Sequence, residues 1–152
     1  MNKIFFYFFL SFGLNIFAHP DSVLKKYSDE LAHLPSPLPD RVVLTWNDDP
    51  ASTQAVNWRT DTSVSEGLAQ IAIANSNGRA LNPKEFKAET TYFKSDINEA
   101  HYHSVIFRNL KSDTLYAYRV GDGANWTEYY HFKTASSKEK PFSFIYFGDA
   151  QN

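Results

Sequence analysis

The residue best placed for chemistry is Asp149, close to the carboxyl-terminal end of the sequence. It follows residues 142–147, an aromatic and β-branched run that is typical of a strand buried on both faces of a sheet. Ligands of open α/β sheets bind just beyond the carboxyl ends of the strands, and carboxylate oxygens are common metal ligands. Asp149 is therefore a candidate metal ligand. The simpler alternative is a turn aspartate after a buried strand.

Two histidines form a second candidate site. His101 and His103 alternate with Tyr102, so on a strand their side chains point to the same face. Such a pair suits a metal ion, but no third ligand lies at a clear local spacing. A structural or interdomain role is the favoured interpretation.

The tryptophans are the remaining candidates. Trp46 and Trp58 occupy inward positions of expected strands, which favours core packing over stacking on a sugar. Trp126 lies on an expected hairpin loop, where an exposed ring would contact a partner or a following domain. Residues 125–127, Asn-Trp-Thr, are also a glycosylation sequon, which matters only in a eukaryotic host.

Composition excludes several classes of function. The sequence has no cysteine, so disulfides, thiolate catalysis and cysteine-bound metals are excluded. Its net charge of −2 gives no electrostatic argument for binding nucleic acid or an anionic membrane. Hydrophobic residues make up 43% and aromatic residues 16% of the chain, a balance that favours a β-rich body.

Residues 1–18 are predicted to be a signal peptide, with Lys3 followed by the apolar residues 4–17 and a small residue at Ala18. A membrane anchor is disfavoured because this run is shorter than the roughly 20 residues that span a bilayer and contains polar residues. We therefore expect a secreted or periplasmic protein without a stable membrane anchor.

Residues 19–39 are predicted to form a helical arm and a proline-rich linker. Leu24, Tyr27, Leu31 and Leu34 recur at helical spacing, and prolines at positions 35, 37 and 39 then stop the helix. A docking helix is one interpretation of this arm, but an ordered lead-in to the following domain is favoured.

From Arg41 the hydrophobic period changes to two, which indicates β-strands. Strands are expected from residue 41 and over 54–60, 67–74, 86–94, 101–107, 114–121 and 129–134. Several short strands separated by turn residues predict an all-β, antiparallel sandwich. The expected inward residues include Val42, Leu44, Trp46, Val56, Trp58, Ile71, Ile73, Val105, Phe107, Tyr116, Tyr118, Val120, Tyr130 and Phe132, with Ala117 and Arg119 outside.

The stretch from residue 110 to residue 121 resembles the signature of fibronectin type III domains around their tyrosine corner, in which a tyrosine hydroxyl bonds back to the upstream chain. Tyr116 is the corresponding tyrosine. The family usually has a proline where this chain has Ser112.

Residues 144–151, which end in Gly-Asp-x-Gln, resemble the first metal-binding motif of the metallophosphoesterases, and the preceding part resembles the amino-terminal domain of purple acid phosphatases. The resemblance implies a fibronectin type III-like domain over residues 40–135, a linker over 136–141 and the start of a catalytic α/β domain over 142–152. We expect residues 142–152 to be disordered or prone to edge pairing without partner strands.

The resemblance further implies that the complete protein hydrolyses phosphate esters at a dinuclear centre, in which Fe³⁺ is paired with a second divalent ion such as Fe, Zn or Mn. Asp149 would be one metal ligand, and the others, like the catalytic residues, would lie after this sequence. Gln151 departs from the residues common in the family. The sandwich would support, orient or dimerise the catalytic domain, so a homodimer is left open.

The alternative is a secreted binding or adhesion module without catalysis, because a fibronectin-like fold alone implies no chemistry.

Overall fold

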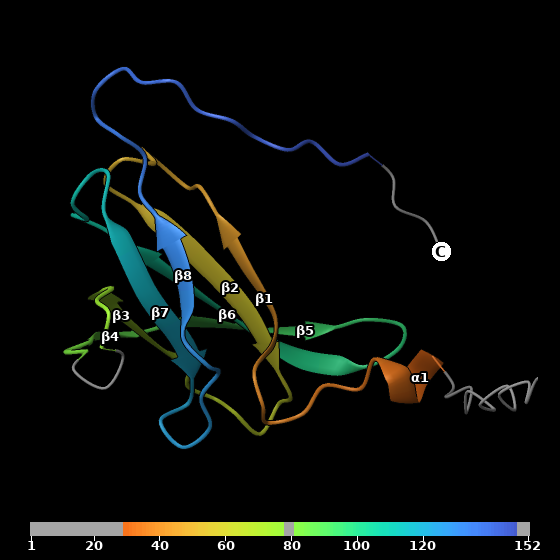
Figure 1. Cartoon of the computed structure of the whole chain (residues 1–152). Helices are drawn as coiled ribbons and strands as arrows, with labels where there is room; N and C mark the ends of the chain where they lie inside the picture. Colours follow the sequence, from red (N-terminus) through yellow and green to blue (C-terminus); the bar gives the residue numbers. More distant parts are fainter. Residues whose placement is uncertain (1–28, 78–80, 149–152) are drawn as a thin grey trace, which may run out of the picture.

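The computed structural model describes residues 29–77 and 81–148, and within them two antiparallel four-stranded sheets pack face to face (Figure 1). The first sheet has the order β1-β2-β6-β5 and the second β4-β3-β7-β8. The strands are β1 Asp40–Thr45, β2 Gln54–Thr60, β3 Leu68–Ile73, β4 Lys84–Lys87, β5 Glu89–Lys94, β6 Glu99–Phe107, β7 Leu115–Gly121 and β8 Tyr130–Lys133. This architecture confirms the predicted fibronectin type III-like sandwich.

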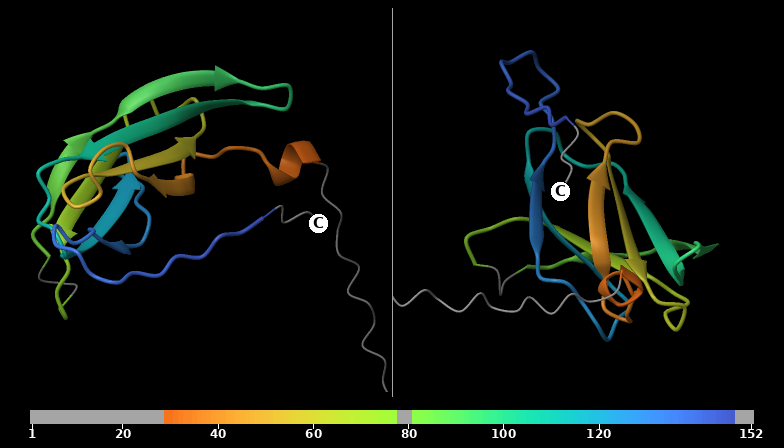
Figure 2. Two further views of the ribbon diagram at one scale, coloured as in Figure 1. Left: turned by 90° about the horizontal axis from the view of Figure 1, so that it is seen from above. Right: turned by 90° about the vertical axis from the view of Figure 1, so that its right-hand side faces the viewer.

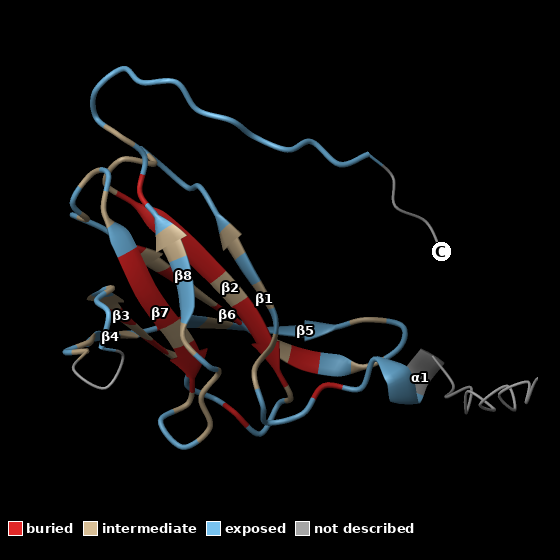
Figure 3. Cartoon of the chain, viewed as in Figure 1, coloured by how far each residue is buried: buried red, intermediate tan, exposed pale blue. Residues whose placement is uncertain are grey.

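The core lies between the central strands of the two sheets (Figure 3). In the first sheet Val56, Trp58 and Phe107 are almost completely buried, and Val120 lies opposite them in the second sheet. These positions are the inward ones that the period of two indicates, and burying each large apolar side chain contributes about 1.5–3 kcal/mol. Packing of apolar side chains, without disulfides, therefore holds the two sheets together.

The expected strand over residues 86–94 is two strands in different sheets. β4 pairs with β3, whereas β5 pairs with β6, and the chain changes sheets at the buried Ala88. The Ala88 N–H donates to the carbonyl oxygen of Gly67 at 2.8 Å, which holds the crossover against the start of β3. Local sequence contains no break here, because the change of partner is made between segments that are distant in the chain.

Four expected side-chain positions are wrong. Tyr130, expected to face inward, is 36% exposed at the start of the edge strand β8. Trp46 is 76% exposed, and it lies just after the last residue of β1. Ile73 is 48% exposed at the end of β3. Ala117 is buried rather than outside: its neighbours across the sheet are Ala72 and His131, and a methyl group is small enough for adjacent residues to cover.

Only the end of the predicted helical arm lies within the described residues. The helix α1 spans Asp29–Ala32, and the proposed signal peptide over residues 1–18 lies outside the described residues. The chain after α1 is fixed to the sandwich, because the Asp61 N–H donates to the Ser36 carbonyl oxygen at 2.9 Å. Leu31 and Leu34 remain exposed. None of the helical structure in residues 29–77 and 81–148 is long and apolar enough to cross a membrane.

Beyond β8 the chain leaves the sandwich as an extended segment (Figure 2). Residues 142–147 form no strand, and the five large apolar side chains among them are 79–85% exposed. A strand with this composition is stable only when neighbouring strands cover both faces. The described structure contains no neighbouring strand for this segment.

Candidate functional site

The predicted metal ligand Asp149 lies outside the described residues, as does Gln151. Gly148, the last residue described, has open space around it: a Cβ built there would have no heavy atom within 4 Å. In residues 29–77 and 81–148, no group of three or more histidine, cysteine, aspartate or glutamate side chains is arranged to hold a metal ion.

His101 and His103 do lie side by side on β6, with ring centroids 6.3 Å apart. Both rings make hydrogen-bonding contacts with other protein groups. His103 is fully buried, with its Nε2 2.8 Å from Thr60 Oγ1 and its Nδ1 2.9 Å from Thr90 Oγ1, and His101 Nδ1 lies 2.7 Å from the Val64 carbonyl oxygen. These contacts support the structural interpretation of the pair.

The environment of His103 keeps its imidazole neutral. The ring stacks on Trp58 with 5.2 Å between centroids, and the Trp58 Nε1 is a buried donor with no hydrogen-bond partner among the described residues. Burial, together with the nearby His101, lowers the pKa of His103 to about 4. His103 is therefore an uncharged part of the core. With this pKa it is unsuited to proton transfer near neutral pH.

Tyr116 makes the hydrogen bond that defines a tyrosine corner: the Lys111 N–H donates to Tyr116 Oη at 2.8 Å. The same loop holds the chain that leaves β8. Thr134 Oγ1 donates to the Lys111 carbonyl oxygen at 2.6 Å, and the Asp113 N–H donates to the Ala135 carbonyl oxygen at 2.9 Å. The loop between β6 and β7 therefore anchors the start of the linker.

Charged side chains extend this anchor along the linker. Asp113 accepts hydrogen bonds from Lys133 at 2.8 Å and from Lys140 at 2.6 Å, and these lysines lower the pKa of Asp113 to about 2. Asp113 has a φ of 51°, a left-handed conformation that aspartate tolerates better than most residues. Lys140 is thereby tied back to the sandwich just before the apolar residues 142–147.

Trp126 is partly buried on the β7–β8 hairpin and packs on the outer face of the second sheet. The Arg119 guanidinium lies between two aromatic rings, 4.5 Å from the centroid of Trp126 and 4.8 Å from that of Tyr129. The Trp126 Nε1 donates to the Gly123 carbonyl oxygen at 3.1 Å. In the described structure these contacts make Trp126 a structural element of the hairpin. The exposed tryptophan is Trp46 instead.

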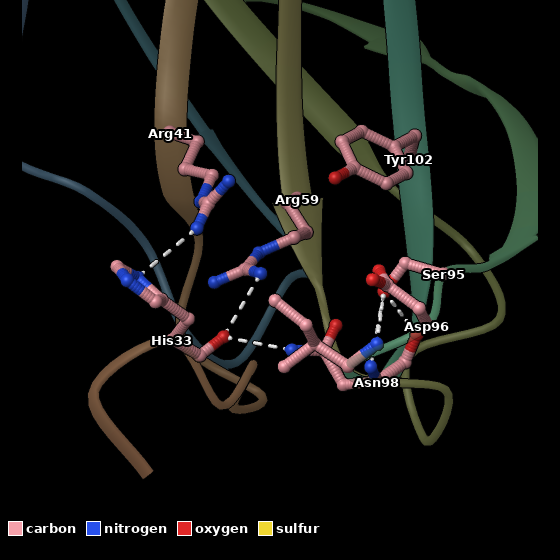
Figure 4. Close-up of a pocket in the computed structure, with 8 residues that line it drawn as sticks. His33, Arg41, Arg59, Ser95, Asp96, Asn98 and Tyr102 are labelled. Atoms are coloured by element: carbon pink, nitrogen blue, oxygen red, sulfur yellow. Dashed lines mark hydrogen bonds between the residues drawn. The ribbon is translucent and has the colours of Figure 1, made fainter. Parts of the chain in front are cut away.

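The structure also contains a cleft of about 380 Å³ that sequence patterns do not indicate. Its walls come from the arm after α1, from β1, β2 and β6, and from the β5–β6 turn (Figure 4). The lining residues are His33, Arg41, Arg59, Ser95, Asp96, Ile97, Asn98 and Tyr102.

Arg59 forms the fixed part of this cleft. Its side chain is 4% exposed, and its Nε and Nη2 donate to the two carboxylate oxygens of Asp40 at 2.8 and 2.5 Å. Its Nη1 donates to the His33 carbonyl oxygen at 3.1 Å, which also accepts from Asn98 Nδ2 at 3.1 Å. Hydrogen bonding to Asp40 raises the pKa of Arg59 above its usual value. The bidentate pair fastens β1 to the centre of the sheet, and the hydrogen bond to His33 fastens the arm.

The only sequence signal for the cleft is the pair of arginines at outward positions of the first two strands. Their partners lie in the arm and in a turn that are far away in sequence, so strand periodicity has no means of bringing them together.

Comparison with known proteins identifies one matching family. Residues 39–134 match the family described as the purple acid phosphatase N-terminal domain. Similar solved structures include the FN1–FN3 domains of chicken CNTN1, with 19% identity, a TM-score of 0.45 and coverage of 67% of this chain and 31% of that one. The fn3 domain of human contactin 1 has 18% identity, a TM-score of 0.45 and coverage of 72% and 86%. Astrotactin-2, a vertebrate-specific, perforin-like membrane protein, has 17% identity, a TM-score of 0.48 and coverage of 68% and 22%.

These structural similarities concern the fold alone, and this chain spans about a third of the chicken structure. A search of curated proteins found no match.

Proposed function

Because the match over residues 39–134 covers most of the chain, the protein belongs to the family of purple acid phosphatase N-terminal domains, and we propose that it is the amino-terminal part of an exported metallophosphoesterase. The observation that carries this proposal is the order of the parts. A sandwich of this family is followed by an anchored linker, a strand-like apolar run and then Gly148-Asp149.

The proposed role of the sandwich is to support and orient the catalytic domain. The hydrogen bonds of Thr134, Ala135 and Lys140 to the β6–β7 loop support this role, because they restrict the direction in which the chain leaves β8. The exposed apolar residues 142–147 would then become the first strand of the next domain, where neighbouring strands would cover them.

The described residues contain no group of three or more ligating side chains that could hold a metal ion. In the longer protein, Asp149 would be a ligand of the Fe³⁺ ion in a dinuclear centre whose second ion is divalent Fe, Zn or Mn. Such a pair of ions clamps a phosphate ester and activates the attacking water. We propose a phosphate ester as the substrate, a secreted or periplasmic location and no stable membrane anchor. We propose that the sandwich forms the interface of a homodimer.

The test uses the protein encoded by the complete reading frame. We expect it to retain two metal ions per chain and to hydrolyse phosphate esters. Asp149→Asn should lower the metal content and reduce hydrolysis by about 100-fold or more, because each metal ligand also fixes the geometry of the other ligands. Asp48→Asn is the matched control: Asp48 is exposed near the β1–β2 turn, 3.5 Å from Arg108.

Full activity and metal content in Asp149→Asn would overturn the assignment of Asp149. A reading frame without further metal-binding motifs would overturn the proposed phosphoesterase activity. It would favour the alternative of a binding or adhesion module without catalysis.

A further inference from the structure

The cleft of Figure 4 contains one positive charge that the protein does not neutralise. The charge of Arg59 is matched by Asp40. The guanidinium of Arg41, by contrast, forms no ion pair with any described residue, and its one hydrogen-bonding contact is Nη2 to His33 Nδ1 at 3.5 Å. A guanidinium has five N–H donors in a planar fork that matches carboxylate and phosphate groups. Most of these donors remain available in the cleft.

The backbone of Arg41 is held in an unfavourable conformation. Its φ is 49°, and the register of β1 against β2 shifts between Asp40 and Val43 in the manner of a β-bulge. In the described chain the other non-glycine residues with positive φ are Asn109 and Asp113, types that tolerate this region. An arginine does not share this tolerance, and bulges often redirect a side chain toward a functional site.

Neutral polar groups and aromatic rings complete the surroundings. Tyr102 lines the cleft with its ring edge-to-face against the half-exposed Phe93, at 6.0 Å between centroids. Ser95 Oγ and Asn98 belong to the turn on the other side, which is ordered by hydrogen bonds between Ser95 and Asn98. The Ser95 hydroxyl proton is already donated to the Asn98 carbonyl oxygen, so the site presents a cation and the Tyr102 hydroxyl beside an apolar rim.

We propose that this cleft binds a small oxyanion, a phosphate or carboxylate group, and that Arg41 is its direct ligand. The cavity of about 380 Å³ has room for such a group together with the small molecule or side chain that carries it. Asp96 is the other charge lining the cleft that forms no ion pair with the described residues, and it opposes an anion. Figure 4 draws it with Ser95 on the side away from Arg41 and His33. The proposal does not depend on the phosphatase assignment.

The test is a titration of the ¹⁵N-labelled chain with inorganic phosphate and, separately, with acetate, followed by NMR. We expect saturable shifts at Asn98, Tyr102 and Arg41. Arg41→Gln should weaken binding at least about tenfold, since it removes a charge-assisted hydrogen bond. Asp96→Asn should strengthen binding by a few-fold, because it removes a like charge from the cleft.

Arg108→Gln is the matched control. Arg108 is an exposed arginine that follows the far end of β6, and its loss should leave binding unchanged. Arg41→Gly distinguishes a binding role from a structural one. Glycine accepts positive φ freely, so this variant should lose binding while its melting temperature stays equal or rises.

Saturation by either anion at the cleft residues supports the proposal and identifies phosphate or carboxylate as the better ligand. Three outcomes would overturn it: no saturable shifts with either anion up to roughly 10 mM, where a millimolar site is nearly full; equal weakening by Arg108→Gln; or retained binding in Arg41→Gly.

Discussion

His103 illustrates how the sandwich uses a polar residue as part of its core. Each ring nitrogen meets a threonine hydroxyl, and the ring face stacks on Trp58. An imidazole that makes both hydrogen bonds in the neutral form fills its space without leaving a charge in the interior. Protonation would place an unpaired positive charge near His101, and this cost makes the fold sensitive to acid.

We predict that the free energy of unfolding falls by about 3 kcal/mol as the pH decreases from 6.5 to 4. The folded-state pKa of His103 is about 4, below the ordinary 6.5. Within this window the unfolded chain therefore binds a proton that the folded chain does not. Above pH 6.5 neither state is protonated, and below pH 4 both are. Urea denaturation at several pH values measures the effect.

His103→Gln preserves an acceptor and a donor for the two threonines but does not titrate. This variant should lose most of the pH dependence between 6.5 and 4. Replacing the exposed His131 with glutamine should leave the dependence intact. Equal slopes in the wild type and in His103→Gln would show that other groups cause the acid sensitivity.

The crossover between β4 and β5 depends on the close approach of Gly67 to the core. A Cβ at Gly67 would lie 2.6 Å from His103 Nδ1 and 2.8 Å from Trp58 Cζ2, inside van der Waals contact. The Gly67 carbonyl oxygen also accepts the hydrogen bond that holds Ala88 at the crossover. Only glycine fits here without a clash. Both the change of sheet at Ala88 and the packing of His103 on Trp58 therefore depend on Gly67.

Gly67→Ala should lower the free energy of unfolding by about 1–3 kcal/mol, because the methyl group displaces two buried rings. Gly148→Ala is the control, since a Cβ there meets no atom within 4 Å. Chemical denaturation of both variants gives the comparison. A Gly67→Ala protein as stable as the wild type would contradict the close packing described for this position.

Asp113 is predicted to control the mobility of the linker more than the stability of the sandwich. Asp113→Asn keeps a residue that tolerates positive φ but removes the charge that holds Lys133 and Lys140. Thermal unfolding should change little, because exposed ion pairs contribute weakly to stability. Backbone ¹⁵N relaxation should report faster motion at residues 138–140. Unchanged relaxation, relative to wild type and Asp48→Asn, would argue against the anchor.

At the scale of the whole molecule, the sandwich and the apolar residues 142–147 differ in whether their large side chains are buried. The sandwich buries its large side chains between two sheets, whereas residues 142–147 expose theirs (Figure 3). A continuous exposed apolar segment with strand composition favours association with other strands. The stability of the sandwich and the solubility of the chain should therefore be separable.

A chain ending at Lys140 should unfold at nearly the same temperature as the 152-residue chain but self-associate less at equal concentration. Thermal denaturation and light scattering measure the two properties. The double variant Phe144→Ser and Tyr146→Ser, in the 152-residue chain, should reduce association in the same way. A large loss of stability on truncation would mean that residues 141–152 pack on the sandwich.

The sequence by itself determined the architecture, because the signals for a sandwich are local. Alternation placed Val56, Trp58 and Phe107 in the core, and the spacing before Tyr116 indicated a tyrosine corner. The same alternation failed at Trp46, since the period of two specifies a face of a strand but not how far the opposing sheet extends.

Only the tertiary structure decided how distant segments meet. The change of sheet at Ala88 depends on which strands lie alongside, and the anchored linker depends on the approach of Thr134 to the β6–β7 loop. The cleft combines Arg41 and Arg59 with residues from the arm and from a turn. These arrangements follow from the packing of elements against one another, which residue types along a single strand do not encode.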